Sequence, residues 1–337
     1  MESFQLTRAQ SPQDAIRAGA TSGTAQQGAE VRFLAGGTTL VDLMKLHVER
    51  PRHVVDISAL PLADIEVLAD GGVRIGAMVR NSDLAHHDLI QRNYPVLSQA
   101  LLSGASAQLR NMATTGGNLL QRTRCVYFRD TAMPCNKREP GTGCSAIGGY
   151  NRNLAILGTS EHCIASNASD MNVALVALDA TVHVQGTGGE RSIPIREFHT
   201  LPGNTPHIET VLQAGDLITH VTLPPPQKSA RSTYLKLRDR ASYEFALASA
   251  AVVASVVDNR IEFIRIALGG VGAKPWHAGE AVTLLQGKSP DMDLFRAAAD
   301  ATLASAVLQS ENGFKLELAR RCLVHALSTV TLPARHA

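Results

Sequence analysis

The segment VRFLAGGTTLVDLMKLH, residues 31–47, predicts a strand, a tight turn and a helix in immediate succession. Residues 31–35 are apolar enough for a buried strand, and the paired glycines that follow allow the chain to turn. Residues 40–47 carry apolar side chains at helical spacing, and RHVVDIS, residues 52–58, predicts a second strand. Strands and helices that alternate over such short distances predict a fold that mixes both elements.

A second glycine pair, in ATTGGNL at residues 113–119, has similar surroundings. Glycine lets main-chain N–H groups approach a ligand, and successive N–H groups form a concavity that suits phosphate oxygens. The helix that starts near residue 40 would turn its positive end toward the same anion. Ordinary β-turns explain the two pairs equally well. The chain has no Walker loop and no G-x-G-x-x-G after a strand, so a dinucleotide would bind outside the Rossmann plan. Side-chain donors near the pairs are Thr38, Thr39, Thr114, Thr115 and Asn118.

Three prolines at residues 224–226 predict a domain boundary, because they cannot continue a sheet. Before them we expect a hairpin with Asp70-Gly71-Gly72 at its turn, and helical structure from Ser82, as N-cap, to about residue 109. A further helix is capped by Ser169 or Asp170. Two strands, TVHVQ and RSIPI, flank a glycine-rich turn.

After the prolines we expect three strands and then three helices. Asp258-Asn259 would form the turn between the second and third strands, and the helices would lie near 279–286, 291–308 and 312–328. The prediction is therefore an α+β protein with one domain over residues 1–226 and a smaller α+β domain, an antiparallel sheet plus helices, over residues 227–337.

The composition is that of a globular protein, with 45% hydrophobic and 18% charged residues. A net charge of +2 and an aromatic share of 4% argue against a nucleic-acid partner. The N-terminal residues lack the apolar core of a secretory signal, and no apolar run reaches the length of a membrane span. We therefore expect a chain that does not direct its own export.

Four of the five cysteines gather in a short, glycine- and proline-rich stretch. Nine, eight and eighteen residues separate Cys125, Cys135, Cys144 and Cys163, whereas Cys322 lies far away in a predicted helix and is expected to be a buried small hydrophobe. The spacing is not that of a zinc finger or of a ferredoxin. A long loop without its own core is typical of a bound metal centre, so an iron–sulfur cluster is favoured, and zinc, disulfides and chance clustering remain as alternatives.

Basic residues surround these cysteines. They would offset the charge of four thiolates or act as solvated loop charges: Arg122, Arg124, Arg129, Lys137 and Arg138. No nucleophile and base stand out among the twelve scattered histidines, which favours a protein whose chemistry belongs to cofactors.

Five stretches, in the same order, resemble one family, the FAD-binding medium subunits of the molybdenum hydroxylases. These subunits serve xanthine dehydrogenase, carbon monoxide dehydrogenase and bacterial aldehyde oxidoreductases. The stretches are LAGGTTLVDLMK, RNMATTGGNL, ASDMNVALVALDA, YLKLRDRASYEFALASAAV and IALGGVGAKPWHAGEAVTLLQGK. The resemblance implies a two-subdomain FAD-binding domain of the vanillyl-alcohol-oxidase (PCMH) type, followed by a domain of the CO-dehydrogenase flavoprotein type.

The resemblance also implies which residues contact FAD. The first loop, the second loop and several separate positions are expected to do so: Ala35, Gly36, Gly37, Thr38, Thr39, Leu40; Thr114, Thr115, Gly116, Gly117, Asn118; and Gly104, Ala105, Asp170, Ile218, Lys236. Of these, Lys236 has the plainest alternative, since a lysine on a strand commonly lies at the surface.

The cysteine-bearing stretch, an insertion at about residues 121–165, is similar to that of two branches of the family, the periplasmic aldehyde oxidoreductases and 4-hydroxybenzoyl-CoA reductase, and is closer to the first. That resemblance implies a [4Fe-4S] cluster bound by Cys125, Cys135, Cys144 and Cys163. It further implies a heterotrimer with a molybdopterin-binding large subunit and a [2Fe-2S] small subunit, aldehyde oxidation, an external electron acceptor, and a periplasmic location reached by co-export with a partner; otherwise the chain would stay cytoplasmic. An aryl-CoA reductase subunit and a stand-alone iron–sulfur redox sensor are the alternatives.

Overall fold

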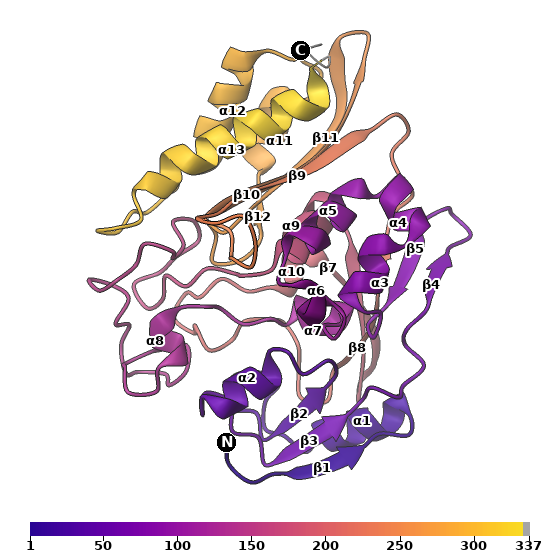
Figure 1. Cartoon of the computed structure of the whole chain (residues 1–337), viewed down its shortest axis with the longest axis vertical. Helices are drawn as coiled ribbons and strands as arrows, with labels where there is room; N and C mark the ends of the chain where they lie inside the picture. The colour runs from indigo at the N-terminus through magenta and orange to yellow at the C-terminus, as the bar shows by residue number, and fades with distance from the viewer. Residues whose placement is uncertain (333–337) are drawn as a thin grey trace.

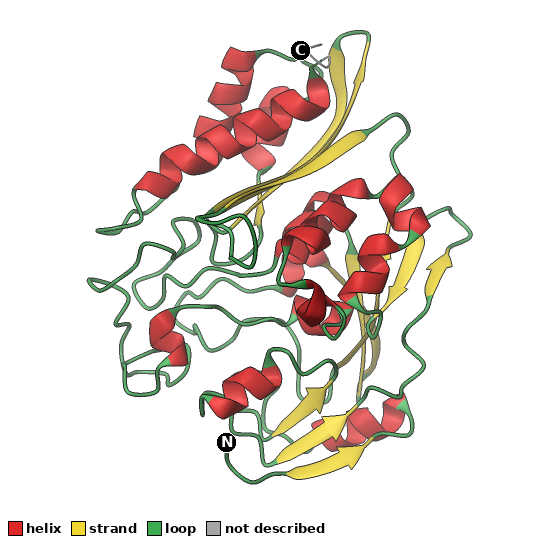
Figure 2. Ribbon diagram, in the orientation of Figure 1, coloured by secondary structure: helices red, strands yellow, loops and turns green. Residues whose placement is uncertain are grey.

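The computed structural model describes residues 1–332. Three sheets follow one another along the long axis, from a small sheet near the N-terminus to a sheet covered by the C-terminal helices (Figure 1). Helices and strands are mixed throughout, which confirms the α+β prediction (Figure 2). Within residues 1–332, no helix combines the length and the apolar composition needed to cross a membrane.

The first sheet has three parallel strands in the order β1-β3-β2. The strand, turn, helix and second strand predicted from residue 31 onward are confirmed, whereas the first strand and helix were not predicted. The first strand was not predicted because three of its four residues are exposed, so it carries no apolar pattern. The elements are β1 (Gln5–Arg8), α1 (Pro12–Gly19), β2 (Val31–Leu34), α2 (Leu40–Lys45) and β3 (His53–Asp56).

The second sheet has five strands in the order β4-β5-β8-β6-β7, and every neighbouring pair is antiparallel. Both predicted hairpins are present, and helices pack on the sheet to form the largest core. The strands are β4 (Ile65–Val67), β5 (Val73–Gly76), β6 (Thr181–Gly186), β7 (Gly189–Pro194) and β8 (Leu217–Leu223). The helices of this part are α3 (Asn81–His86), α4 (Asp88–Asn93), α5 (Pro95–Ser103), α6 (Ala107–Arg110), α7 (Thr115–Leu119), α9 (Asp170–Ala177) and α10 (Ile195–Phe198).

The predicted cap at Ser82 is wrong, and the predicted cap at Ser169 is confirmed. Helix α3 begins one residue earlier, after Arg80, and no side chain caps it. An extended residue, His87, separates α3 from α4, so the helical region is broken into short pieces. Ser169, in contrast, accepts a hydrogen bond from the amide of Asn172 and fixes the start of α9.

The third sheet is antiparallel in the order β12-β11-β10-β9, and three helices cover one of its faces (Figure 1). Asp258 and Asn259 both have positive φ, as a tight two-residue hairpin turn requires, which confirms that turn. The elements are β9 (Arg231–Leu237), β10 (Ala248–Val257), β11 (Arg260–Gly269), β12 (Trp276–His277), α11 (Gly279–Leu285), α12 (Met292–Leu303) and α13 (Phe314–Thr331).

Strand β10 is buried on both of its faces. Ala250 and Val252 belong to different cores than their neighbours: these two side chains pack with the C-terminal helices, whereas Ala251 and Val253 pack with the core of the five-stranded sheet and its helices. Because successive side chains of a strand point to opposite sides, a strand that is apolar at nearly every position can fill both cores. The third sheet is therefore clamped between two layers of helices.

The cysteine-bearing segment contains one short helix among its described residues, α8 (Val126–Arg129), and otherwise consists of loops. These loops run along one side of the molecule between the C-terminal domain and α2 (Figure 1). They enclose a small core that includes Phe128 and Leu154 together with the cysteines.

Buried polar residues tie the end of this segment to the C-terminal domain. Lys315, which is fully buried, donates hydrogen bonds from Nζ to the carbonyl oxygens of Asn153, Leu154 and Gly270 at 3.2, 2.9 and 2.6 Å. Asn151, also fully buried, accepts a bond from the amide of Glu311. Since each buried carbonyl needs a donor, these side chains hold the loop against α13.

We expect Lys315→Met to destabilise the protein by about 3 kcal/mol or more, because three carbonyl oxygens each lose a hydrogen bond from a buried donor. The measurement is the urea-induced unfolding of the purified chain. Lys288→Met is the matched control, since Lys288 is exposed and should leave the unfolding curve within about 0.5 kcal/mol. Equal curves for the two variants would contradict this role of Lys315.

Candidate functional site

The two glycine loops meet at one cavity. A Cβ atom at Gly36 would collide with the carbonyl oxygen of Met112, just before the second loop, so only glycine fits there. Gly37 has a φ of +72°, a conformation that favours glycine. The cavity is lined by all six predicted residues of the first loop, by Thr114 and Gly117 of the second, and by Cys163.

The first loop presents a run of free main-chain donors. Within residues 1–332, no protein acceptor receives a hydrogen bond from the amides of residues 36–40. The next amide, of Val41, donates to Gly37 at 3.0 Å and starts the α2 hydrogen bonds. Successive unpaired N–H groups that line a cavity form the kind of concavity that binds phosphate oxygens.

The second loop is built differently. The amides of Thr115 and Gly116 donate to Val79 and Ala77 on the neighbouring β5–α3 connection, and the amide of Gly117 donates to the Thr114 hydroxyl. Thr115, Gly116 and Asn118 do not line the cavity. The amides of the second loop therefore hold that loop in place, whereas the amides of residues 36–40 in the first loop have no acceptor within residues 1–332.

A second cavity adjoins the first and lies near another group of predicted residues. Asp170 lines it, and Ser166 and Asn167 line both cavities. Lys236 lies 2.8 Å from the Asp170 carboxylate and its side chain is 3% exposed, so it is not a surface lysine. Gly104 lies beside the same carboxylate, and the next residue, Ala105, has a positive φ. Ile218 is part of β8, is buried in the core of the five-stranded sheet, and lines neither cavity.

All four clustered cysteines have free thiols and lie together. Cys125, Cys135 and Cys163 are buried in one small core, and Cys144 packs against it half-buried. One isolated antiparallel β-bridge, a main-chain pairing and not a disulfide, joins Cys135 and Cys144. In residues 1–332, no group of three or more histidine, cysteine, aspartate or glutamate side chains is arranged to hold a metal ion.

The thiols differ in their surroundings. Burial raises the pKa of Cys125 to about 12, although the nearby main chain of Phe128 and Tyr127 acts in the opposite direction. The amide of Ala165 donates to Cys163 Sγ at 3.5 Å. Cys125 lines the second cavity and Cys163 the first, so the cysteine segment borders both. Cys322 is buried in α13 next to Leu235, as predicted.

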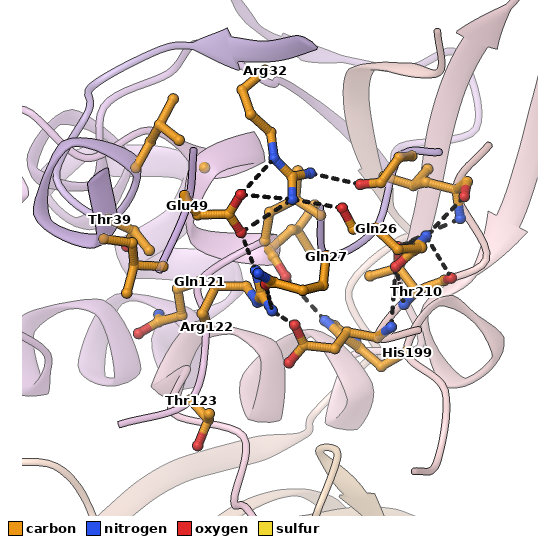
Figure 3. A pocket seen from close by; sticks show the side chains of 18 of the residues that line it. Gln26, Gln27, Arg32, Thr39, Glu49, Gln121, Arg122, Thr123, His199 and Thr210 are labelled. Carbon is orange, nitrogen blue, oxygen red and sulfur yellow. Dashed lines mark hydrogen bonds and ion pairs between the residues drawn. The ribbon is translucent and has the colours of Figure 1, made fainter. Parts of the chain in front are cut away.

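A buried network of charges forms one wall of the first cavity (Figure 3). Arg32 pairs with Glu49 at 2.9 Å, and Arg122 pairs with both Glu49 and Glu209. Lys137 lies 3.1 Å from Glu209. Burial alone would raise the pKa of Glu209, but the charges of Arg122 and Lys137 hold that pKa below its usual value. The Glu209 carboxylate therefore stays ionised in the cavity wall.

The basic residues of the cysteine segment are thus not solvated. The side chains of Arg122 and Lys137 are 13% and 10% exposed. Arg124 and Arg129 both pair with Asp42 on α2, at 3.2 and 2.8 Å. The segment is fastened to the helix that follows the first glycine loop. Sequence reasoning did not identify the carboxylate partners, because they lie far away along the chain.

His199 is another cavity residue that the sequence did not reveal. It is buried, and its Nε2 lies 3.0 Å from the carbonyl oxygen of Leu119, which makes Nε2 the protonated nitrogen. Nδ1 has no partner within residues 1–332. Burial lowers the pKa of His199 to about 4, so at neutral pH the ring is uncharged and Nδ1 carries an unshared electron pair.

Comparison with known proteins gives one answer over nearly the whole chain. Residues 2–226 match the family described as the FAD binding domain in molybdopterin dehydrogenase, and residues 232–330 match the CO dehydrogenase flavoprotein C-terminal domain. The chain is 49% identical to the aldehyde oxidoreductase FAD-binding subunit PaoB of Escherichia coli (strain K12), over 97% of this chain and 98% of that one.

More distant relatives match most of the chain. The glyceraldehyde dehydrogenase medium chain of Sulfolobus acidocaldarius is 28% identical over 87% of this chain and 84% of its own. A structure of carbon monoxide dehydrogenase from Hydrogenophaga pseudoflava superposes with a TM-score of 0.76 at 24% identity, and covers 98% of this chain and 97% of that one. This likeness concerns the fold.

The neutral state of His199 predicts a loss of stability in acid. The unfolded chain binds a proton on this histidine below its ordinary pKa of 6.5, whereas the folded chain does so only near 4, so stability falls as the pH falls through that interval. The expected contribution is about 3 kcal/mol. Urea unfolding from about pH 7 to about pH 4 should show a smaller decline for His199→Gln than for the wild type. Parallel declines would mean that His199 titrates normally in the folded chain.

Proposed function

Because the chain belongs to the FAD-binding medium subunits of the molybdenum hydroxylase family, we propose that it carries electrons within an aldehyde oxidoreductase, through FAD and a [4Fe-4S] cluster. The observation that carries this proposal is the run of free amides at residues 36–40, on the cavity wall beside a group of four free thiols. The aldehyde activity is supported by the 49% identity to an aldehyde oxidoreductase subunit.

The first loop fits the FAD diphosphate. Its amides from Gly36 to Leu40 offer donors that have no acceptor among residues 1–332, and Gly37 keeps the backbone open to a close approach. The hydroxyl groups of Thr38 and Thr39, and Thr114 and Gly117 on the opposite side, complete the wall. The unpaired Nδ1 of His199 can accept a hydrogen bond from a hydroxyl or N–H group of the cofactor.

The second cavity extends the same site. The shared residues Ser166 and Asn167 connect it to the first, and Asp170, held by Lys236, provides a buried carboxylate there. We propose that FAD extends past Ser166 toward Asp170, Gly104 and Lys236. Ile218 and the buried residues of the second loop would then support the site from behind.

The four cysteines fit an iron–sulfur cluster better than a single ion. Each thiolate of a [4Fe-4S] cluster binds a different iron atom, so its four sulfurs stand farther apart than the ligands of one metal ion. Four free thiols at one small core are the ligand type and number that such a cluster takes. The amide of Ala165 already donates to Cys163 Sγ and would stabilise this sulfur as a thiolate.

The reaction takes two electrons from the substrate. An aldehyde and water become a carboxylic acid, with the release of two electrons and two protons. We propose that this step occurs on a molybdopterin-binding large subunit and that a [2Fe-2S] small subunit relays the electrons. Bound FAD supplies two-electron redox chemistry and an exit to an external acceptor. This chain's residues bind the cofactors, exclude water from them and set the charge around them.

The complex is proposed to be a heterotrimer that reaches the periplasm with a signal-bearing partner, in line with the resemblance to the periplasmic branch. Cell fractionation of the co-expressed complex tests the location. Turnover of aromatic aldehydes, compared with reduction of aryl-CoA, separates the aldehyde oxidoreductase from the aryl-CoA reductase. A chain that binds neither flavin nor molybdenum subunits would point to a stand-alone redox sensor.

We expect Cys125→Ser, Cys135→Ser, Cys144→Ser and Cys163→Ser each to lower iron and sulfide from about four of each per chain to half or less, because a cubane needs all four thiolates. The measurement is iron and sulfide analysis of the reconstituted chain. Cys322→Ser is the control and should retain full iron, since this thiol lies apart in α13. Undiminished iron in any of the four variants would contradict the assignment.

We expect Gly36→Ala to lose most of its bound FAD, because the new methyl group collides with the Met112 carbonyl and displaces the amides of the first loop. Flavin released on denaturation, measured per chain, reports the loss. Gly23→Ala is the control, since a Cβ there has no neighbour within 4 Å and the backbone φ is not positive. Full flavin content in Gly36→Ala would argue against the first loop as the diphosphate site.

A further inference from the structure

Two basic residues of the cysteine segment form part of the wall of the first cavity. Arg122 precedes Cys125 by three positions, and Lys137 follows Cys135 by two. Both side chains line the cavity, where they meet Glu209. The cavity is therefore incomplete without the cysteine segment.

The contacts of Arg122 show how firmly the two parts are joined. Its guanidinium pairs with Glu49 and Glu209 and donates to Gln27 Oε1 at 2.9 Å (Figure 3). The same group lies 4.9 Å from the centre of the Phe128 ring, which is buried in the core formed by the four cysteines. Any displacement of that core would move Arg122, and with it the cavity wall.

Lys137 makes the second connection. Its Nζ lies 3.1 Å from Glu209 and donates to the carbonyl oxygen of Pro206 at 2.9 Å. Among residues 1–332, Glu209 pairs with no cation from outside the cysteine segment. The Glu209 side chain is 23% exposed, and a largely buried carboxylate that loses its cations is destabilised, so Glu209 and the loop around it would rearrange if the segment became disordered.

Metal held by the sulfurs would add to the order of the segment. It has one short helix and a small core, and a loop of this kind gains much of its order from a bound metal centre. Metal bound at the cysteines would therefore keep Arg122 and Lys137 in the cavity wall, and its loss would release them.

We propose that Arg122 and Lys137 are positioning residues through which metal at the four cysteines and FAD in the first cavity stabilise each other's binding. The proposal rests on the two cofactor sites of the proposed function. Such a coupling is reciprocal, so a bound flavin also strengthens the retention of iron by the same factor. Because the ion pairs with Glu209 connect the two sites, loss of the metal centre would weaken the binding of FAD.

The test is the affinity of the purified full-length chain for FAD, measured from flavin fluorescence with the cluster reconstituted and again after removal of iron with a chelator. We expect iron removal to weaken FAD binding of the wild type about tenfold or more. In Glu209→Gln the two affinities should differ by less than about threefold, because the connecting carboxylate is neutral. Glu190→Gln, an exposed carboxylate on β7, should retain the full effect of iron.

Lys137→Met provides a second variant if Glu209→Gln does not fold, and it should also reduce the effect of iron, whereas Lys137→Arg should restore it. The proposal is overturned if iron-free wild type binds FAD as tightly as the iron-loaded chain. It is also overturned if Glu209→Gln weakens FAD binding equally in both states, since Glu209 would then be only a wall of the cavity. A chain that takes up no iron contradicts the cluster assignment itself, and iron analysis of each sample distinguishes that outcome.

Discussion

The site depends on one constraint: the amides of residues 36–40 line a cavity and have no acceptor within residues 1–332. Main-chain donors need a partner, and a molecule bound in the cavity would supply acceptors to these amides. The elements next to this loop keep it in place. The parallel strands β2 and β3 set where it begins, α2 sets where it ends, and the second glycine loop closes against Gly36.

The cysteine segment is joined to the same loop by charge. Asp42 on α2 forms ion pairs with Arg124 and Arg129. Glu49, shortly after α2, forms an ion pair with Arg122. Exposed ion pairs contribute little, but these side chains are at least half-buried and share partners, so each depends on the others. The arrangement makes the insertion part of the cofactor site, and not an appendage on its surface.

Local patterns in the sequence predicted most of the fold. Alternating or continuous apolar residues identified β2, β3, β10 and β11, and Asp258-Asn259 identified a hairpin turn. The exposed strand β1 carries no such pattern, and the start of α3 could not be placed because no side chain caps it. Boundaries that depend on tertiary contacts leave little trace in a local window.

The site was predictable only in part, for a similar reason. The glycine pairs and the cysteines have local signatures, whereas the partners of Arg122 lie 73 residues away at Glu49 and still farther along the chain at Glu209. A charged residue in a polar loop is usually solvated, so nothing nearby distinguishes these from ordinary surface residues. Lys236 shows the same limit, since only the fold brings it to Asp170.

Strand β10, with one core on each side, has a consequence for how the polypeptide can be divided. An N-terminal fragment that ended at the prolines would leave α5 and α9 uncovered, because β9, β10 and β11 pack on them. The C-terminal fragment would expose to water the β10 side chains that pack on those helices, such as Ala251 and Val253. Neither half is therefore expected to fold and stay monomeric when expressed alone. Two halves made from separate genes would have to associate before the exposed apolar surface of either one aggregates.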